Sequence, residues 1–137
     1  MKTYETMKAV RFQHCDPAGV VFTPQYFNLF MEVVEDWFAH LGYGFSKIVI
    51  KEHQGIPAMR IIAKFFKPSF LGDQLQFVLN VKRLREKNVL VNVTAFCDQE
   101  RRCTTEFLFG FAALSSLSLV EWPEGLREGM SEYLQGR

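Results

Sequence analysis

Apolar residues follow two different periods along this 137-residue chain. Between residues 24 and 41 they recur at offsets of three and four, the spacing that places them on one side of a helix. From residue 58 onward they alternate with polar residues, which is typical of strands with one buried face. The pattern therefore predicts a helix of about five turns followed by a sheet. The apolar side of the helix consists of Phe27, Phe30, Met31, Val34, Phe38 and Leu41.

Local signals mark the bounds of this helix. Thr23 offers a hydroxyl suited to the N-cap, and Pro24 suits the first helical position, where its missing N–H costs nothing. Gly42 is a natural C-terminal stop. Residues 7–13, ahead of the helix, predict a short strand that leads into a turn.

The second half of the chain predicts a sheet. Strands are expected over residues 58–66, 74–82, 89–95 and 105–111, and short connections make the last three an antiparallel meander. One long helix packed on a sheet of about five strands closes a core, so the fold class is α+β. The tail over residues 123–137 predicts a short amphipathic helix. The whole chain, residues 1–137, is expected to form a single domain.

Several strands also carry large apolar side chains on the face that the helix does not cover. Contiguous apolar area of this kind usually marks association, so we expect a homo-oligomer that packs sheets together or extends them edge to edge. The side chains concerned are Ile62, Phe66, Val78, Leu90, Phe96 and Leu108.

Composition and charge narrow the function classes. Aromatic residues make up 15% of the chain and include 14 Phe, which favours an aromatic core, an apolar ligand site or a large subunit interface. The formal net charge is +1, from 16 basic and 15 acidic residues, so no overall field draws the chain to nucleic acid or to anionic lipid. The start of the chain lacks the apolar core of a signal peptide, and no run reaches membrane-spanning length, so a cytoplasmic location is expected.

The three cysteines predict neither a disulfide framework nor a metal site. Their number is odd, and in a reducing cytosol Cys97 and Cys103 should remain thiols beside a hairpin turn. No nearby His completes a zinc site with them. We therefore expect no metal.

The stretch HCDPAGVVF, residues 14–22, allows two interpretations. Asp16, Pro17 and Gly19 occupy the first, second and fourth positions of a type I turn, in which the Asp side chain caps local amides. Alternatively, Asp16 is a carboxylate held for chemistry, because the turn brings it back in an apolar setting beside the N-terminus of the helix. Unpaired backbone N–H groups at that end polarise a carbonyl and hold a developing oxyanion.

Two stretches carry a family resemblance. HCDPAGVVFTPQYF resembles the opening signature of hotdog-fold thioesterases of the 4-hydroxybenzoyl-CoA thioesterase class, and KPSFLGDQLQF is similar to that family's second landmark. The resemblance implies a five-stranded antiparallel sheet wrapped around one long central helix, residues 24–41. It also implies active sites at a dimer interface, often within a tetramer.

The resemblance assigns roles to two residues. Asp16 would be the catalytic carboxylate, acting as nucleophile on the thioester carbonyl or as base for water. The backbone N–H of Thr23 would be the oxyanion donor; some relatives carry Tyr there, and the backbone role does not depend on the side chain. A thiolate is a good leaving group, and no Ser-His-Asp or Cys-His pattern competes for the role.

Other candidates surround these two. His14 orients Asp16, touches the acyl group or is a plain surface residue, and Phe27 fits the core as well as it fits an acyl pocket. The full set of expected substrate contacts is His14, Pro17, Gly19, Phe22, Tyr26 and Phe27. Contacts to the coenzyme A phosphates are expected from Lys64, Lys67 and Arg102, with Arg83 and Arg101 as further candidates.

The sequence thus predicts an acyl-CoA thioesterase that produces a carboxylate and free coenzyme A without a cofactor, with an aryl-CoA such as 4-hydroxybenzoyl-CoA as the favoured substrate. Three alternatives remain open. One is a fatty acyl-CoA thioesterase, and another is a hotdog protein that binds acyl-CoA or acyl carrier protein without turnover. The third is a dehydratase of the same fold, which usually needs a His and a carboxylate around the helix, where only His40 is found, at the far end.

Overall fold

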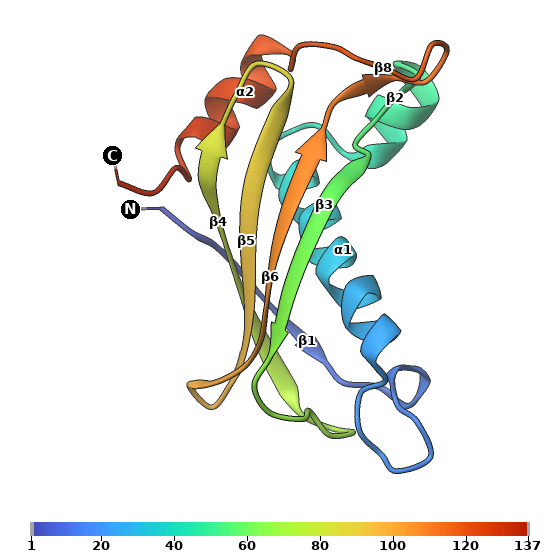
Figure 1. Cartoon of the computed structure of the whole chain (residues 1–137), viewed down its shortest axis with the longest axis vertical. Coiled ribbons are helices and arrows are strands. Elements are labelled where there is room, and N and C mark those ends of the chain that lie inside the picture. The colour runs from blue at the N-terminus through green and yellow to red at the C-terminus, as the bar shows by residue number, and fades with distance from the viewer. Residues whose placement is uncertain (1, 137) are drawn as a thin grey trace.

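The computed structural model describes residues 2–136. Its main sheet has five strands, all paired antiparallel, in the spatial order β1-β4-β5-β6-β3. Helix α1 lies behind this sheet in the view of Figure 1, on one of its two faces. The predicted five-stranded antiparallel sheet is confirmed. The strands are β1 (Tyr4–Ala9), β3 (Ala58–Phe65), β4 (Gln74–Leu84), β5 (Asn88–Cys97) and β6 (Glu100–Gly110), and α1 spans Thr23–His40.

The smaller elements gather mainly at the end of the molecule away from the start of α1 (Figure 1). Three two-residue strands form a second sheet in the order β2-β7-β8. The C-terminal helix α2 buries Leu126 and Met130 and is followed by the buried Tyr133, so the predicted tail helix is present. These elements are η1 (Phe12–His14), η2 (Ser46–Lys51), β2 (Gln54–Gly55), β7 (Ala112–Ala113), β8 (Ser118–Leu119) and α2 (Glu124–Ser131).

Helix α1 has 18 residues and buries one side against the sheet. The ring of Phe30 meets Phe77 edge-on at 5.6 Å between centroids, and Phe107 at 6.2 Å. Edge-to-face arrangements of this kind stabilise a core beyond the area that they bury. The buried side is rotated slightly from the predicted one and consists of Tyr26, Leu29, Phe30, Val33, Val34, Trp37 and Phe38.

Two local predictions are wrong. The N-cap position of α1 is held by Phe22, with no side-chain cap, so Thr23 is inside the helix and its hydroxyl does not cap it. The strand expected over residues 7–13 begins and ends earlier, as β1: the Val10 N–H still bonds to the Asp73 carbonyl next to Gln74, the partner of Ala9, and the His14 N–H then bonds to the Arg11 carbonyl and turns the chain. The chain then forms the short helix η1.

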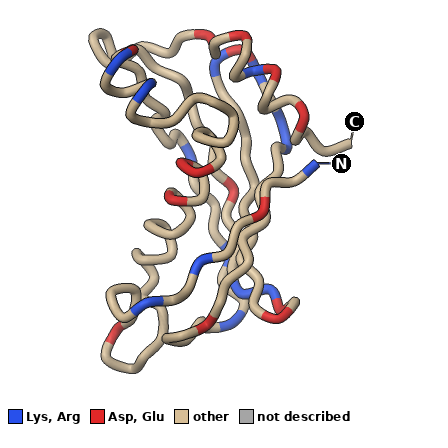
Figure 2. The backbone as a smooth tube through the Cα atoms, turned by 180° about the vertical axis from the view of Figure 1, so that it is seen from behind, with Lys and Arg blue, Asp and Glu red and all other residues tan. Residues whose placement is uncertain are grey.

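The outer face of the sheet, opposite α1, differs from prediction in part. Ile62 and Phe66 are exposed as expected, whereas Leu90 is buried beside its cross-strand neighbours on β4 and β6. Strand β3 is an edge strand, and all of its residues except Ala63 are exposed. Lys and Arg are interspersed with Asp and Glu along the backbone (Figure 2), and no described helix is long and apolar enough to cross a membrane.

We expect Phe30→Ala to lower the free energy of unfolding by about 3–5 kcal/mol, because it empties the fully buried contact between α1 and the sheet. Chemical denaturation followed by circular dichroism measures the change. Phe12→Ala is the matched control: Phe12 is 84% exposed, and its loss should cost at most about 0.5 kcal/mol. Equal costs for the two variants would contradict this packing of α1.

Candidate functional site

Asp16 begins a tight turn, and an antiparallel β-bridge between Cys15 and Val21 joins the residues on either side of it. The Gly19 N–H donates to the Asp16 carbonyl at 2.9 Å, and the Asp16 N–H donates to the Val20 carbonyl at 3.0 Å. Gly19 has φ of +79°, a conformation that favours glycine. The Asp16 Oδ1 atom accepts the Ala18 N–H at 2.9 Å, so the turn-capping interpretation is correct for this oxygen. Within residues 2–136, the Oδ2 atom accepts no hydrogen bond, so it remains available for chemistry.

Backbone hydrogen bonds hold this turn against the loop of residues 68–73. The Val21 N–H donates to the Ser69 carbonyl at 2.9 Å, and the Leu71 N–H donates to the Gly19 carbonyl at 3.0 Å. A bridge between Val20 and Phe70 adds to the contact. The KPSFLGD segment therefore supports the turn from a distance of about fifty residues in sequence.

A cavity of about 310 Å³ lies beside the start of α1. Thr23 is the first residue of the helix, and Pro24 has no N–H, so the free backbone donors at this end are few and point away from the helix. The helix dipole makes this end favourable for a developing negative charge. The cavity is lined by Val21, Thr23, Tyr26, Phe65, Phe66, Lys67 and Pro68.

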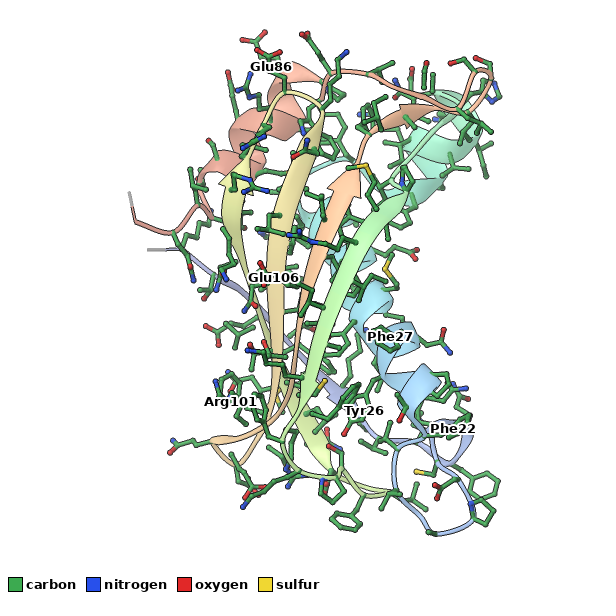
Figure 3. All side chains as sticks on the ribbon, viewed as in Figure 1. Phe22, Tyr26, Phe27, Glu86, Arg101 and Glu106 are labelled. Carbon is green, nitrogen blue, oxygen red and sulfur yellow. The ribbon has the colours of Figure 1, made fainter. Side chains whose placement is uncertain are left out.

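Tyr26 supplies a buried hydroxyl in the wall of this cavity. The side chain lies between α1 and the end of β3 (Figure 3), where its ring is 5.6 Å from that of Phe65. Its hydroxyl donates to the Ser69 Oγ atom at 2.9 Å. Burial raises the pKa of the Tyr26 phenol, and its hydrogen bond to Ser69 offsets only part of this rise, so the phenol is neutral at physiological pH.

Arg102 of β6 holds the 68–73 loop rather than facing solvent. Its Nη1 atom is 2.8 Å from the Asp73 carboxylate and 3.0 Å from the Pro68 carbonyl, and its Nε atom is 2.7 Å from Glu100. The Arg102 side chain is only 12% exposed. Lys67 completes the network through an ion pair with Glu100 at 3.0 Å.

The contacts of Asp73 with the loop and with Arg102 change the pKa of its carboxyl group. Burial raises the pKa of its carboxyl group, but the Phe70 N–H and the Arg102 guanidinium lower it by more, so the pKa lies below its ordinary value. The charged form of Asp73 is therefore the one that stabilises the folded loop.

The other predicted residues lie in different places. His14 is buried, with its Nδ1 atom accepting the Arg11 N–H at 2.9 Å, and it lines a second cavity of about 300 Å³ between β1 and α1. Lys64 is exposed and lines a third cavity on the outer face of the sheet, where Arg101 and Glu106 also lie (Figure 3). The structure thus gathers Thr23, Tyr26 and Lys67 around one cavity, whose lining does not include Asp16, His14 or Lys64. The turn of Asp16 reaches this cavity through Val21.

Residues of the turn and the helix start differ in exposure. Pro17 is exposed on the turn, and Phe22 is 54% exposed at the entry to α1. Phe27 is partly buried against the hydrophobic core, which agrees with the core interpretation of that residue. Gly19 shapes the turn through its backbone.

Sequence reasoning missed Ser69, Asp73 and Phe65 as parts of the site. Ser69 and Asp73 lie in the KPSFLGD stretch that carries the family resemblance, but the contacts of all three residues join segments far apart in the chain, so the motif alone did not assign them a role. Within the described residues, no cluster of three or more His, Cys, Asp or Glu side chains is placed to hold a metal ion.

Comparisons with known proteins agree with this geometry. A family model described as the thioesterase-like superfamily matches residues 10–130. A 1,4-dihydroxy-2-naphthoyl-CoA hydrolase of Acaryochloris marina (strain MBIC 11017) is 32% identical over 96 residues, which cover 69% of this chain and 70% of the relative.

Two solved structures share the fold. A 1,4-dihydroxy-2-naphthoyl-CoA thioesterase from Synechocystis has a TM-score of 0.88 at 17% identity, with 96% of this chain and 97% of that chain covered. A Staphylococcus aureus protein solved in complex with CoA has a TM-score of 0.90 at 14% identity, with 99% and 86% covered. The hotdog type of fold is therefore confirmed.

We expect Asp73→Asn to destabilise the chain by about 1–2 kcal/mol at pH 7, because it removes a partly exposed charge-assisted contact with Arg102. Since the pKa of Asp73 is lower in the folded chain than in the unfolded chain, this contribution is present above about pH 4 and disappears as the pH falls through the folded pKa. Unfolding free energies of both proteins across pH 2–7 measure it. A difference that stays constant down to the lowest pH would contradict the ion pair.

Proposed function

The chain belongs to the thioesterase-like superfamily, and on that premise we propose that it hydrolyses a hydroxylated aromatic acyl-CoA thioester to the carboxylate and free coenzyme A. The family match and the curated CoA hydrolase relative support a thioester hydrolase. One observation carries the proposal for this chain. The Asp16 turn is anchored at the start of α1, next to a cavity with three aromatic residues in its wall.

Asp16 supplies the carboxylate for the reaction. In the nucleophilic route, Oδ2 bonds to the thioester carbonyl carbon, the oxyanion is held by the Thr23 N–H, and its collapse expels the coenzyme A thiolate. Water then hydrolyses the mixed anhydride, which releases the acid and restores Asp16. In the general-base route, Asp16 takes a proton from the water that attacks the same carbon. Both routes need one free carboxylate oxygen and one helix N-terminal donor.

The proposed acyl group is aromatic because Tyr26, Phe65 and Phe66 line the cavity. The preference for a ring hydroxyl follows from Tyr26. Its own proton is donated to Ser69, so its oxygen remains an acceptor for a hydroxyl on the substrate. Two esters that carry such a hydroxyl are 4-hydroxybenzoyl-CoA and 1,4-dihydroxy-2-naphthoyl-CoA. The second is the one in the name of the Acaryochloris marina relative.

For the coenzyme A phosphates, we propose Lys67 at the cavity and Lys64 on β3. The Arg102 guanidinium is already engaged by two carboxylates, which leaves it less suited to a phosphate. The proposal includes a cytoplasmic, homotetrameric enzyme that needs no metal or cofactor, as the sequence predicts.

We expect Asp16→Asn to lower kcat by on the order of a thousandfold or more, with little change in KM. Asn keeps an oxygen that accepts the Ala18 N–H, so the turn persists while the reactive carboxylate is lost. The measurement is release of free thiol from 4-hydroxybenzoyl-, 1,4-dihydroxy-2-naphthoyl-, butyryl- and palmitoyl-CoA. Glu121→Gln, which neutralises an exposed carboxylate on another segment, is the control and should retain the wild-type rate.

The same panel separates the alternatives. Faster turnover of palmitoyl-CoA than of the aryl esters would favour a fatty acyl-CoA thioesterase. Binding of acyl-CoA by the wild type without any thiol release would overturn hydrolysis in favour of a binding protein.

We expect Tyr26→Phe to reduce the preference for 4-hydroxybenzoyl-CoA over benzoyl-CoA by roughly tenfold in kcat/KM, since the variant keeps the ring and loses the acceptor. Rates with benzoyl-CoA itself should change little, which makes that ester an internal control. If the preference is the same in both proteins, Tyr26 does not contact the ring hydroxyl.

A further inference from the structure

Arg102 is the centre of a hydrogen-bond network that joins β6 to the 68–73 loop. Its guanidinium contacts the Asp73 carboxylate, the Pro68 carbonyl and, at 3.4 Å, the Ser69 Oγ atom. Burial lowers the pKa of Arg102, but its carboxylate partners raise it by more, so the side chain is charged at all relevant pH values. One side chain thus fixes both ends of the loop.

Asp73 connects the same hydrogen-bond network to the middle of the loop. The Oδ2 atom that binds Arg102 also accepts the Phe70 N–H at 2.9 Å. Together with the Arg102 contacts at Pro68 and Ser69, this bond leaves the loop backbone little freedom between residues 68 and 73. A guanidinium fork with several fixed acceptors is better suited to this task than a single ammonium group.

The loop in turn holds the reactive turn. The Ser69 carbonyl accepts the Val21 N–H, and the Leu71 N–H donates to the Gly19 carbonyl; Gly19 and Val21 both lie between Asp16 and Thr23. Within residues 2–136, the remaining backbone hydrogen bonds of residues 19–21 join them to Asp16 of the turn itself. The Phe22 N–H also donates to the His14 carbonyl at 2.9 Å and closes the base of the turn, so the loop acts together with this bond in setting the position of Asp16 relative to the Thr23 N–H.

From these contacts we infer that Arg102 is a positioning residue for thioester hydrolysis: through the 68–73 loop it fixes the Asp16 turn against the start of α1. The inference rests on the proposed function, and it replaces the expectation that Arg102 binds a coenzyme A phosphate. A misplacement of about 1 Å between reacting groups costs on the order of a hundredfold in rate, so loosening the loop should act on kcat.

The test compares two substrates with the same thioester and pantetheine arm, 4-hydroxybenzoyl-CoA and the 4-hydroxybenzoyl thioester of pantetheine; only the first carries the 3'-phospho-ADP part, which holds all of the phosphates. Arg102→Gln should lower kcat by roughly tenfold to a hundredfold with both esters alike. Arg102→Lys, which keeps the charge beside Asp73 but loses the fork, should show a smaller loss with both. Amide hydrogen exchange of Val21 and Leu71 should be faster in both variants.

Two matched variants provide the controls. Arg127→Gln removes an exposed arginine from α2, and its kinetics should match the wild type. Lys64→Gln removes the proposed phosphate ligand on β3, which lies outside both the cavity and the Arg102 network, so it should raise KM for the coenzyme A ester and leave the pantetheine ester unaffected. The midpoint of thermal unfolding is measured for each variant, and the kinetic assays are run at least ten degrees below it. The comparison is then made on folded protein only.

Each contrary result is distinct. A loss confined to the coenzyme A ester and expressed in KM would make Arg102 a phosphate ligand and overturn the inference. Wild-type kcat in folded Arg102→Gln, with only a lower melting temperature, would reduce Arg102 to a structural role. If Arg102→Gln does not fold, wild-type kcat and exchange rates in Arg102→Lys would overturn it. If the wild type hydrolyses neither ester, the proposed function itself fails, and this inference falls with it.

Discussion

Packing of the aromatic side of α1 against the sheet is the interaction on which the rest of the structure depends. Phe30 lies between Phe77 and Phe107, and Trp37 and Phe38 continue the same contact toward the C-terminus of the helix. Because this side is buried along the whole helix, the N-terminus of α1 is fixed relative to the strand ends. Only then do a turn, a loop and an edge strand meet at one place.

Polar contacts determine the part of the structure that apolar packing leaves undetermined. Aromatic side chains fix where α1 lies, but they do not determine the path of the chain that enters it. That path is set by directional bonds: the Val21 N–H to Ser69, the Tyr26 hydroxyl to Ser69 and the Arg102 guanidinium to Asp73. Buried polar groups are costly unless they are paired, so such a network admits few alternative arrangements. A reactive carboxylate gains most from this restriction, because its rate depends on distance and direction.

The sequence predicts the elements of this fold better than its site. Alternation and helical spacing are local patterns, and they identify the strands from residue 58 onward and the helix to within one residue at each end. The start of the chain was harder, since β1 ends at Ala9 and the chain turns through η1, which no period of apolar residues marks. Asp16 and Tyr26 were candidates from the sequence because the motif and the helix start are local as well. Ser69 and Asp73 were not found, and Arg102 was expected to bind phosphate, because their roles arise only from contacts across the fold.

Strand β3 links the site to the surface of the chain. It is an edge strand whose Met59, Ile61 and Phe65 side chains are 44–48% exposed, on the side of the strand opposite Ile62, which belongs to the apolar face predicted to associate. An exposed apolar edge strand is a template for pairing with another chain. Phe65 belongs both to this edge and to the cavity beside Tyr26. Any chain that paired with β3 would therefore change the shape of the cavity and its access to water, and through Phe65 it would act on the acyl-group preference that we propose.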